Sequence, residues 1–195
     1  MLTSQMMEDL NDHINESIQI KKDLYLHEKT INKIIKKIYS TLNLKKKIYI
    51  CGNGGSAADA QHIATEYTVR LKKNNNRRPL PVIALSSDSA YFTACGNDFG
   101  FEKIYVRALE ALHSKNDLLI VLSTSGNSKN LIEAVNFAKK NKIFSIGFLG
   151  NTGGKLKSLC STSLIINSKN TARIQETHMF LGHYICEKVE DLIFK

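Results

Sequence analysis

The chain has 195 residues, a length that predicts one domain with a sizeable core rather than two domains. Hydrophobic residues make up 43% and charged residues 23% of the chain, which is typical of globular proteins and excludes collagen-like and wholly disordered chains. The net charge of +9 would favour any phosphate-bearing partner. The lysines are scattered and no RNA- or DNA-binding motif accompanies them, so we expect no nucleic acid.

The lengths of the hydrophobic runs and the spacing of the cysteines argue against membrane, secreted and disulfide-bonded proteins. No stretch approaches the roughly 18 uninterrupted apolar residues of a membrane span, and the first residues lack the apolar region of a secretory signal. We therefore expect no membrane partner and a cytoplasmic location. Four scattered cysteines without a CxxC pair predict reduced, mostly buried thiols. They are Cys51, Cys95, Cys160 and Cys186.

Two amphipathic helices are predicted over residues 5–45. Apolar residues recur every three or four positions, as Leu10, Ile14 and Ile18 in the first helix and as Ile31, Ile34, Ile35, Ile38 and Leu42 in the second. This apolar stripe needs a partner, either the sheet of the same chain or another subunit. We expect it to pack between subunits.

From residue 48 onward, short apolar runs alternate with helix-length segments. The runs are 48–51, 82–85, 118–122, 144–149 and 164–166. They predict an α/β protein, a three-layer doubly wound fold in which helices cover both faces of five parallel strands. The polar stretch 72–79 is predicted to be an exposed loop before the second strand. In such sheets ligands bind beyond the carboxyl ends of the strands.

A glycine-rich loop, Gly52-Asn53-Gly54-Gly55-Ser56, follows the first strand and precedes a helix predicted from about Ala57 to Arg70. Its backbone could approach a ligand closely at the helix N-terminus. The loop lacks the Lys-Ser/Thr of a Walker motif and the third glycine of GxGxxG. Taken alone, it is equally well explained as a tight connection.

A hydroxyl-rich loop, Ser123-Thr124-Ser125-Gly126-Asn127-Ser128, follows the third strand and precedes a helix. Four hydroxyls in six residues exceed the single Ser or Thr that a helix cap requires. This favours a binding site for a phosphate monoester. The two loops together indicate a sugar phosphate, with its hydroxyls directed toward Asn53 and Ser56.

Titratable residues at helical spacing suggest further candidates. His62 and Glu66 lie one turn apart, and Gln175, His178 and His183 share the last predicted helix. Spacing alone favours ordinary core or surface histidines over metal ligands, and Glu66 could simply pair with Arg70. In Gly96-Asn97-Asp98-Phe99-Gly100-Phe101, Asp98 is predicted to cap the next helix or to act as an acid or base.

Five motifs, in their order along the chain, resemble those of the sugar isomerase (SIS) domain of the phosphoheptose isomerase type. They are 51–56, 59–66, 96–101, 123–128 and the segment from Ala172 to His183. The resemblance implies a single SIS domain over residues 1–195, flavodoxin-like, with an N-terminal helical segment at 1–45. It also implies a homotetramer.

The resemblance implies an activity as well, the interconversion of sedoheptulose 7-phosphate and D-glycero-D-manno-heptose 7-phosphate for bacterial lipopolysaccharide or capsule. One zinc ion per subunit would be held by His62, Glu66, Gln175 and His183. Substrate contacts would come from Asn53, Gly54, Gly55, Ser56, Glu66, Asn97, Asp98, Ser123, Thr124, Ser125, Ser128 and Gln175. His178 would be structural.

The chemistry of aldose–ketose isomerisation assigns the catalytic roles within this resemblance. Hydrogen moves between adjacent carbons through an enediolate, which requires a base, an acid and an electrophile. We assign Glu66 as base and His183 as acid, roles that exchange in the reverse direction, and zinc as electrophile.

Two other functions compete with this one. The first is a non-catalytic SIS-domain tetramer that binds the bacterial replication-initiator protein, which needs neither a metal nor a proton shuttle. Glu66 and His183 therefore favour the enzyme. The second is a sugar-phosphate sensor linked to a DNA-binding module, which is disfavoured because the leading helices lack a helix-turn-helix pattern.

Overall fold

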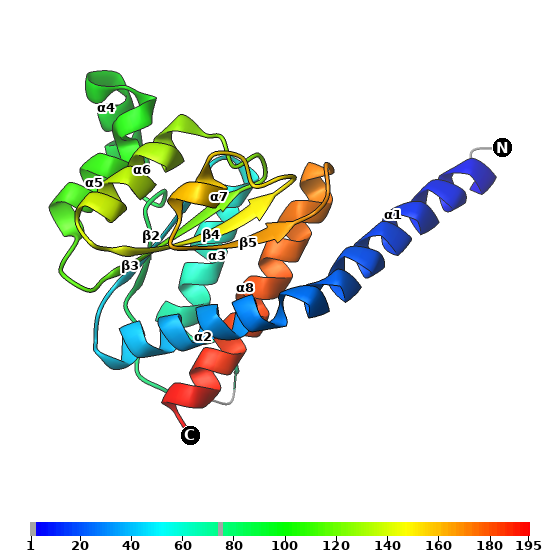
Figure 1. The fold of residues 1–195 in the computed structure, drawn as a ribbon, viewed down its shortest axis with the longest axis horizontal. Coiled ribbons are helices and arrows are strands. Elements are labelled where there is room, and N and C mark those ends of the chain that lie inside the picture. The colour runs from blue at the N-terminus through cyan, green and yellow to red at the C-terminus, as the bar shows by residue number, and fades with distance from the viewer. Residues whose placement is uncertain (1–2, 74–75) are drawn as a thin grey trace.

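Five parallel strands form the centre of the molecule, in the order β2-β1-β3-β4-β5 (Figure 1). The structure is a computed structural model and describes residues 3–73 and 76–195. The strands are β1 (Ile48–Gly52), β2 (Val82–Ala84), β3 (Leu118–Ser123), β4 (Phe144–Gly150) and β5 (Thr162–Ile166). All five predicted runs are confirmed as strands of one parallel sheet, with the order of the flavodoxin-like doubly wound fold.

Helices cover both faces of the sheet. They are α1 (Thr3–Asp23), α2 (Glu28–Asn43), α3 (Gly55–Thr68), α4 (Ser89–Phe99), α5 (Ile104–Leu112), α6 (Lys129–Lys140), α7 (Leu156–Leu159) and α8 (Thr171–Ile193), with 3₁₀ turns η1 (Leu24–His27) and η2 (Phe101–Lys103). The helix after the glycine loop therefore begins and ends two residues earlier than predicted.

The sheet is buried from both sides, which explains its continuous apolar runs. Every residue of β1 and β3 is buried. Alternate residues point to opposite faces. Ile48 and Ile50 belong to the core formed with α2, α3 and α8, whereas Tyr49 and Cys51 belong to the core formed with α5 and α6. The three-layer architecture is thus confirmed.

The two N-terminal helices have different environments. They are joined through η1, and α1 projects away from the body of the molecule (Figure 1). The stripe on α2 is buried in the chain's own core, with Ile34, Ile38 and Leu42 at most 1% exposed. On α1, Leu10 and Ile14 remain about half exposed. The expectation that the whole stripe packs between subunits is therefore wrong for α2, because the sheet already covers it.

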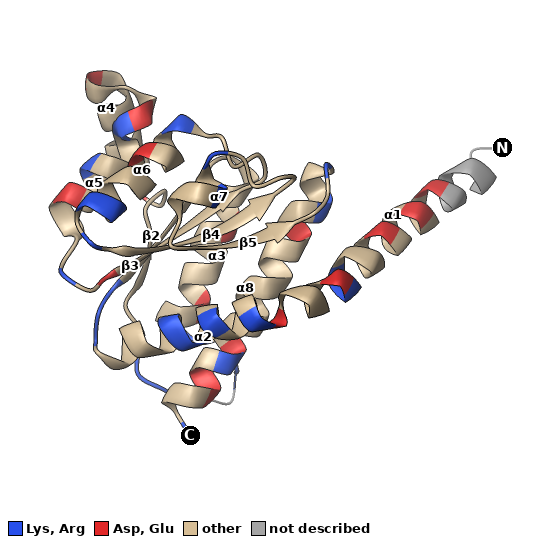
Figure 2. Cartoon of the chain, in the orientation of Figure 1, with Lys and Arg blue, Asp and Glu red and all other residues tan. Residues whose placement is uncertain are grey.

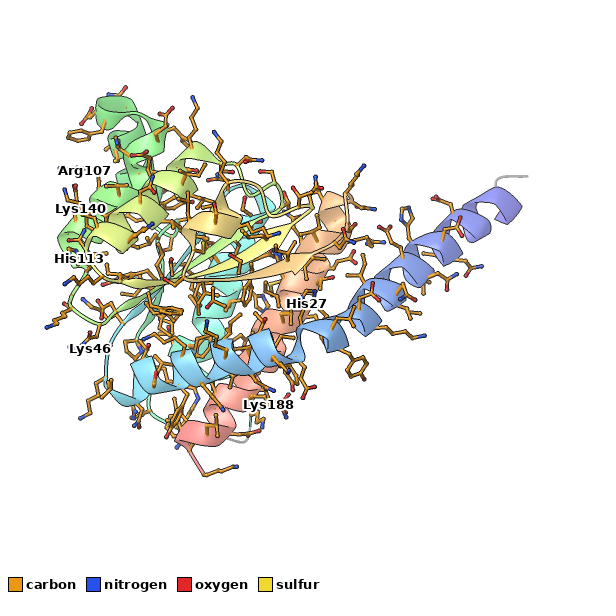
Figure 3. The ribbon with its side chains drawn as sticks, viewed as in Figure 1. His27, Lys46, Arg107, His113, Lys140 and Lys188 are labelled. Atoms are coloured by element: carbon orange, nitrogen blue, oxygen red, sulfur yellow. The ribbon has the colours of Figure 1, made fainter. Side chains whose placement is uncertain are left out.

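Charged side chains are spread over the surface. Lysines and arginines lie on several elements, α2 among them (Figure 2). In Figure 3, Arg107 and Lys140 lie on the side of α5 and α6, whereas His27 and Lys188 lie near α2 and α8. All four cysteines are free, and three of them are buried. Among the described residues, no helix has both the length and the apolar character needed to cross a membrane.

The polar stretch 72–79 is only partly the exposed loop that its composition predicts. Lys73, Asn76 and Arg78 are exposed. The side chain of Arg77, in contrast, is buried and paired with Glu190. Asn74 and Asn75 lie outside the described residues.

Candidate active site

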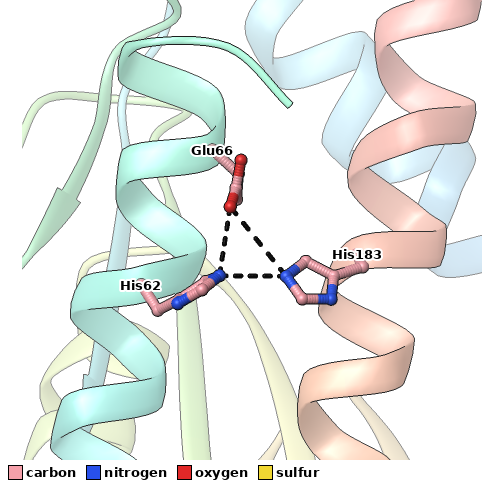
Figure 4. A group of neighbouring side chains, drawn as sticks. All are labelled: His62, Glu66 and His183. Atoms are coloured by element: carbon pink, nitrogen blue, oxygen red, sulfur yellow. Dashed lines mark hydrogen bonds and ion pairs between the residues drawn. The ribbon is translucent and has the colours of Figure 1, made fainter. Parts of the chain in front are cut away.

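Two histidines and a glutamate meet between α3 and α8 (Figure 4). His62 Nε2 lies 3.0 Å from Glu66 Oε1 and 3.0 Å from His183 Nε2, and His183 Nε2 lies 3.9 Å from Glu66 Oε1. One ligand atom from each residue lies within 4.8 Å of the other two. The residues of this His–Glu–His cluster come from segments more than 100 positions apart in the sequence.

The local structure of α3 and α8 explains how the cluster forms. His62 and Glu66 are one helical turn apart and so project from the same face of α3. Gly182, next to His183, faces Ile63, next to His62, and a Cβ atom at Gly182 would lie 2.7 Å from Ile63 Cγ1 and Cδ1. The missing side chain lets the two helices approach closely enough for their ligands to meet.

The donor set suits a divalent metal or a proton transfer. Two imidazole nitrogens and one carboxylate oxygen are ligands that zinc accepts, and three protein ligands leave a position open for a substrate. Half of the His62 side chain and 42% of the His183 side chain are exposed, whereas Glu66 is 20% exposed. In a single chain the cluster is therefore open to solvent on its histidine side.

Gln175, the fourth predicted metal ligand, lies at the glycine loop. A Cβ atom on Gly55 would fall 2.5 Å from Gln175 Nε2. Gly55 and His62 are seven residues apart in α3, which corresponds to two turns and about 10 Å. The side chain of Gln175 therefore lies beside the glycine loop at the start of α3, and its role as fourth metal ligand stays a prediction.

In the glycine loop, hydrogen bonds fix the side chain of Asn53, whereas Gly54 and Gly55 are exposed. Gly54 has a φ of +55° and is exposed together with Gly55, whereas Ser56 is only 3% exposed. The Asn53 side chain is held by a reciprocal amide pair, in which Asn53 Nδ2 donates to Asn130 Oδ1 (3.0 Å) and Asn130 Nδ2 donates to Asn53 Oδ1 (2.8 Å). The glycines at the tip of the loop are therefore accessible from solvent, whereas Ser56 is not.

The hydroxyl-rich loop is tied to its neighbours by some of its hydroxyls. Ser123 Oγ accepts a hydrogen bond from Gly126 N (3.0 Å), and Ser125 Oγ accepts one from Asn127 N (3.2 Å). Thr124 and Ser128 are half-buried at the mouth of the loop. The loop stands at the carboxyl end of β3, which pairs with β1, so the two loops lie side by side.

Asn97 and Asp98 lie away from the cluster. Both occupy the last turn of α4, where Asn97 Nδ2 donates to Asp98 Oδ1 (2.9 Å). The prediction that Asp98 caps the following helix is wrong, because α4 continues through Phe99 and ends at Gly100, whose φ is +84°. In Figure 1, α4 lies at the far end of the molecule from α8. A single chain therefore does not bring these two residues to His183.

His178 is fully buried among apolar residues, with its ring 6.1 Å from that of Phe148. Burial lowers the pKa of His178 to about 4, so the ring is neutral at physiological pH. On α3, burial of Asp59 raises the pKa of that carboxyl, and the nearby His62 partly offsets the rise. A structural position for His178 agrees with the sequence analysis.

Two residues at the site escaped the sequence analysis. Asn130 is buried, and its side chain fixes that of Asn53. The only indication of this role in the sequence is that a residue with an amide side chain stands in the first turn of the helix after the hydroxyl-rich loop. Arg77 contacts the end of α3, although it is embedded in a polar stretch that is typical of a surface loop. Asn130 and Arg77 both lie far in sequence from the residues that they contact, so composition and spacing could not reveal these contacts.

Comparison with known proteins agrees with the geometry. The sequence matches the family model described as the SIS domain over residues 11–150. It is 46% identical over 183 residues to the phosphoheptose isomerase of a Nitratiruptor species, a match that covers 88% of this chain and 97% of the relative. A phosphoheptose isomerase of Campylobacter concisus is also 46% identical, over 182 residues, covering 88% of this chain and 95% of the relative.

Solved structures extend the similarity to the fold. A phosphoheptose isomerase from Francisella tularensis superposes with a TM-score of 0.90 at 33% identity, covering 95% of this chain and 98% of that chain. One from Neisseria gonorrhoeae gives a TM-score of 0.89 at 35% identity, covering 95% of this chain and 99% of that chain. The family match ends at residue 150, so one SIS domain over residues 1–195 stays a prediction.

Proposed function

Because the chain belongs to the SIS-domain family and, within it, to the phosphoheptose isomerases, we propose that it interconverts sedoheptulose 7-phosphate and D-glycero-D-manno-heptose 7-phosphate. The chain is a sugar-phosphate isomerase. The meeting of His62, Glu66 and His183 at one point supports the finer assignment, because an isomerase of this kind needs groups that move a proton between neighbouring carbons.

The cluster supplies the groups that the reaction requires. Glu66 removes the proton from the carbon beside the carbonyl, and His183 donates a proton to the carbonyl oxygen, which gives an enediol. His183 then takes the proton of the neighbouring hydroxyl, and Glu66 returns its proton to the former carbonyl carbon, which completes the isomerisation. Zinc, when bound by His62, Glu66 and His183, supplies a Lewis acid that polarises the carbonyl. Gln175 would complete the metal site, as the family resemblance implies, and its position beside Gly55 also supports a contact with the substrate.

The substrate would extend from the loops toward the cluster. We place its phosphate in the hydroxyl-rich loop, where Thr124, Ser128 and the amides at the start of α6 can donate hydrogen bonds. The glycine loop and Gln175 would contact the middle of the sugar. Because the cluster lies about two turns further along α3, an extended seven-carbon chain can place its first carbons there.

We also propose that the enzyme works as a homotetramer. Three observations support an assembly that completes the site: the exposed stripe on α1, the exposed Phe180 and Tyr184 on the helix of His183, and the open histidine side of the cluster. Asn97 and Asp98 could then reach a cluster only across a subunit boundary. A water-excluding wall from a second subunit would also strengthen the electrostatics of the site.

The assay that tests this function uses purified protein and sedoheptulose 7-phosphate. We expect the aldose product to form, and we expect unphosphorylated sedoheptulose to be a poor substrate because the hydroxyl-rich loop would then lack its ligand. Binding of the sugar phosphate without turnover would instead support the non-catalytic SIS tetramer. The curated relatives and the presence of Glu66 and His183 do not favour that alternative.

Removing the metal tests the proposed cofactor. We expect a chelator to abolish turnover and zinc to restore it, while circular dichroism shows an unchanged fold, because the buried sheet does not depend on an ion. Full activity of metal-free protein would contradict the zinc proposal. It would leave acid–base catalysis by Glu66 and His183 in place.

A further inference from the structure

A buried ion pair joins Arg77 to Glu190. Arg77 Nε lies 2.9 Å from Glu190 Oε2, and each side chain is 1% exposed. The ring of Phe194 covers the guanidinium, with 5.5 Å between Arg77 Cζ and the ring centroid. Such a pair is costly to separate, because breaking it leaves a charge buried without its partner.

The same guanidinium caps the end of α3. Arg77 Nη2 donates to the Glu66 carbonyl (2.7 Å) and Arg77 Nη1 donates to the Tyr67 carbonyl (2.9 Å). The last four carbonyls of a helix have no partner within the helix, and a cation there also complements the helix dipole. One side chain thus binds the backbone of Glu66 and, through Glu190, the helix α8.

The position of Glu190 relates this contact to the His–Glu–His cluster. Glu190 follows His183 by seven residues, so both project from nearly the same face of α8, two turns apart. The two helices that carry the cluster are therefore joined at Gly182 and Ile63 and again, two turns along α8, at Arg77 and Glu190.

We propose that Arg77 and Glu190 are positioning residues that set the separation of α3 and α8 and thereby preorganise the metal site. The inference rests on the proposed function, since it assumes that His62, Glu66 and His183 hold a metal. A metal site tolerates displacements of only about 0.5 Å in its ligands, and rigid neighbours supply that precision. Glu66 is held directly, because its own carbonyl accepts from Arg77.

A neighbouring ion pair provides a matched control. Lys72 pairs with Asp191 between the same two segments of the chain, but the two side chains are 38% and 40% exposed. Exposed pairs are screened by water and contribute little. Within the described part of the chain, Lys72 donates to Asp191 and not to the end of α3. Its loss should leave the separation of the helices unchanged.

The test measures zinc affinity by competition with a chromogenic chelator, on full-length protein. We expect Glu190→Gln and Arg77→Lys to bind zinc at least about tenfold more weakly than the wild type, the range typical for partners that orient metal ligands. Asp191→Asn and Lys72→Gln should change the affinity by less than about threefold. Equal affinities in all four variants would overturn the inference while leaving the metal site standing.

A double variant distinguishes positioning of the metal ligands by Arg77 and Glu190 from a mere contribution of this ion pair to the stability of the fold. Replacing a buried ion pair by apolar residues often preserves stability, so Arg77→Met with Glu190→Met should unfold near the wild-type temperature. Methionine offers the Glu66 carbonyl no donor, so zinc affinity should stay at least about tenfold low. Recovery of zinc affinity together with stability would overturn the inference. A wild-type chain that takes up no zinc would overturn the proposed metal site and this inference with it.

Discussion

Glu66 is the residue on which the proposed chemistry depends most. Glu66→Gln keeps the size of the side chain but removes the base and weakens a metal ligand, so turnover should fall about 10²–10⁴-fold. Only 20% of the side chain is exposed, and the amide fits the same space, so the fold should persist. Turnover of zinc-loaded protein on sedoheptulose 7-phosphate measures the effect.

The same chemical change far from the site is the control. Glu133 on α6 forms an exposed ion pair with Lys103, so Glu133→Gln should leave turnover unchanged. Near-normal turnover of Glu66→Gln would show that another group removes the proton.

His178 should make the protein sensitive to acid. Its pKa of about 4 in the folded state lies below the ordinary value of about 6.5, so the unfolded chain takes up a proton that the folded chain does not. The contribution of His178 to the free energy of unfolding is therefore fully present above about pH 6.5. It is lost as the pH falls toward 4, and the total loss is about 3 kcal/mol.

Urea unfolding of metal-free protein at about pH 7.5 and about pH 4.5 measures this loss. His178→Phe should show a smaller acid-induced loss than the wild type, because phenylalanine does not titrate and is apolar like the surroundings of the ring. His13→Asn, at an exposed position on α1, is the control. An equal loss in His178→Phe and the wild type would assign the acid sensitivity to other groups.

At the scale of elements, the contact between α3 and α8 should control the cluster. Gly182→Ala places a methyl group 2.7 Å from Ile63 Cγ1, so one helix must shift, at a typical cost of about 1–3 kcal/mol. Because His62 and His183 flank this contact, both turnover and zinc affinity should fall.

A compensating change tests whether crowding is the cause. Ile63→Val removes the Cδ1 atom that the new methyl group would meet, so the double variant with Gly182→Ala should regain part of the lost turnover. Ile63→Val alone should cost only about 0.5–1.5 kcal/mol of stability. Wild-type turnover in Gly182→Ala would show that the spacing of the helices is not critical.

At the scale of the whole molecule, the open stripe on α1 should hold subunits together. Replacing Leu10, Ile14 and Ile18 by glutamine keeps good helix formers but removes the apolar surface. If the wild type is the tetramer proposed above, light scattering should detect a smaller species for this variant. We expect turnover to fall with it, because the site would lose a wall.

Changes on a polar face of α1 are the control. Asn11 and Asn15 are exposed, and their replacement by glutamine should change neither assembly nor turnover. A fully active monomer of the stripe variant would show that the active site is complete within one chain. Substitutions on α1 are better suited to this test than removal of residues 1–45, because α2 is part of the core.

The sequence by itself determined the elements of this protein and the shared helix face of two residues of the His–Glu–His cluster. Apolar runs such as Leu118–Leu122 predicted the strands, because a strand buried on both faces must be apolar throughout. The spacing of His62 and Glu66 placed them on one face, because that relation is local to a helix. The ordered motifs identified the family, which the comparisons support.

Only the tertiary structure decided which distant residues meet. His183 reaches His62 because Gly182 permits close packing of α3 and α8, a contact between segments that no periodicity relates. Arg77 was predicted to be exposed, since its neighbours are polar, yet it is buried because Glu190 and the end of α3 satisfy its charge and donors. Spacing describes neighbours along one helix, whereas contacts between helices depend on how the sheet stacks them.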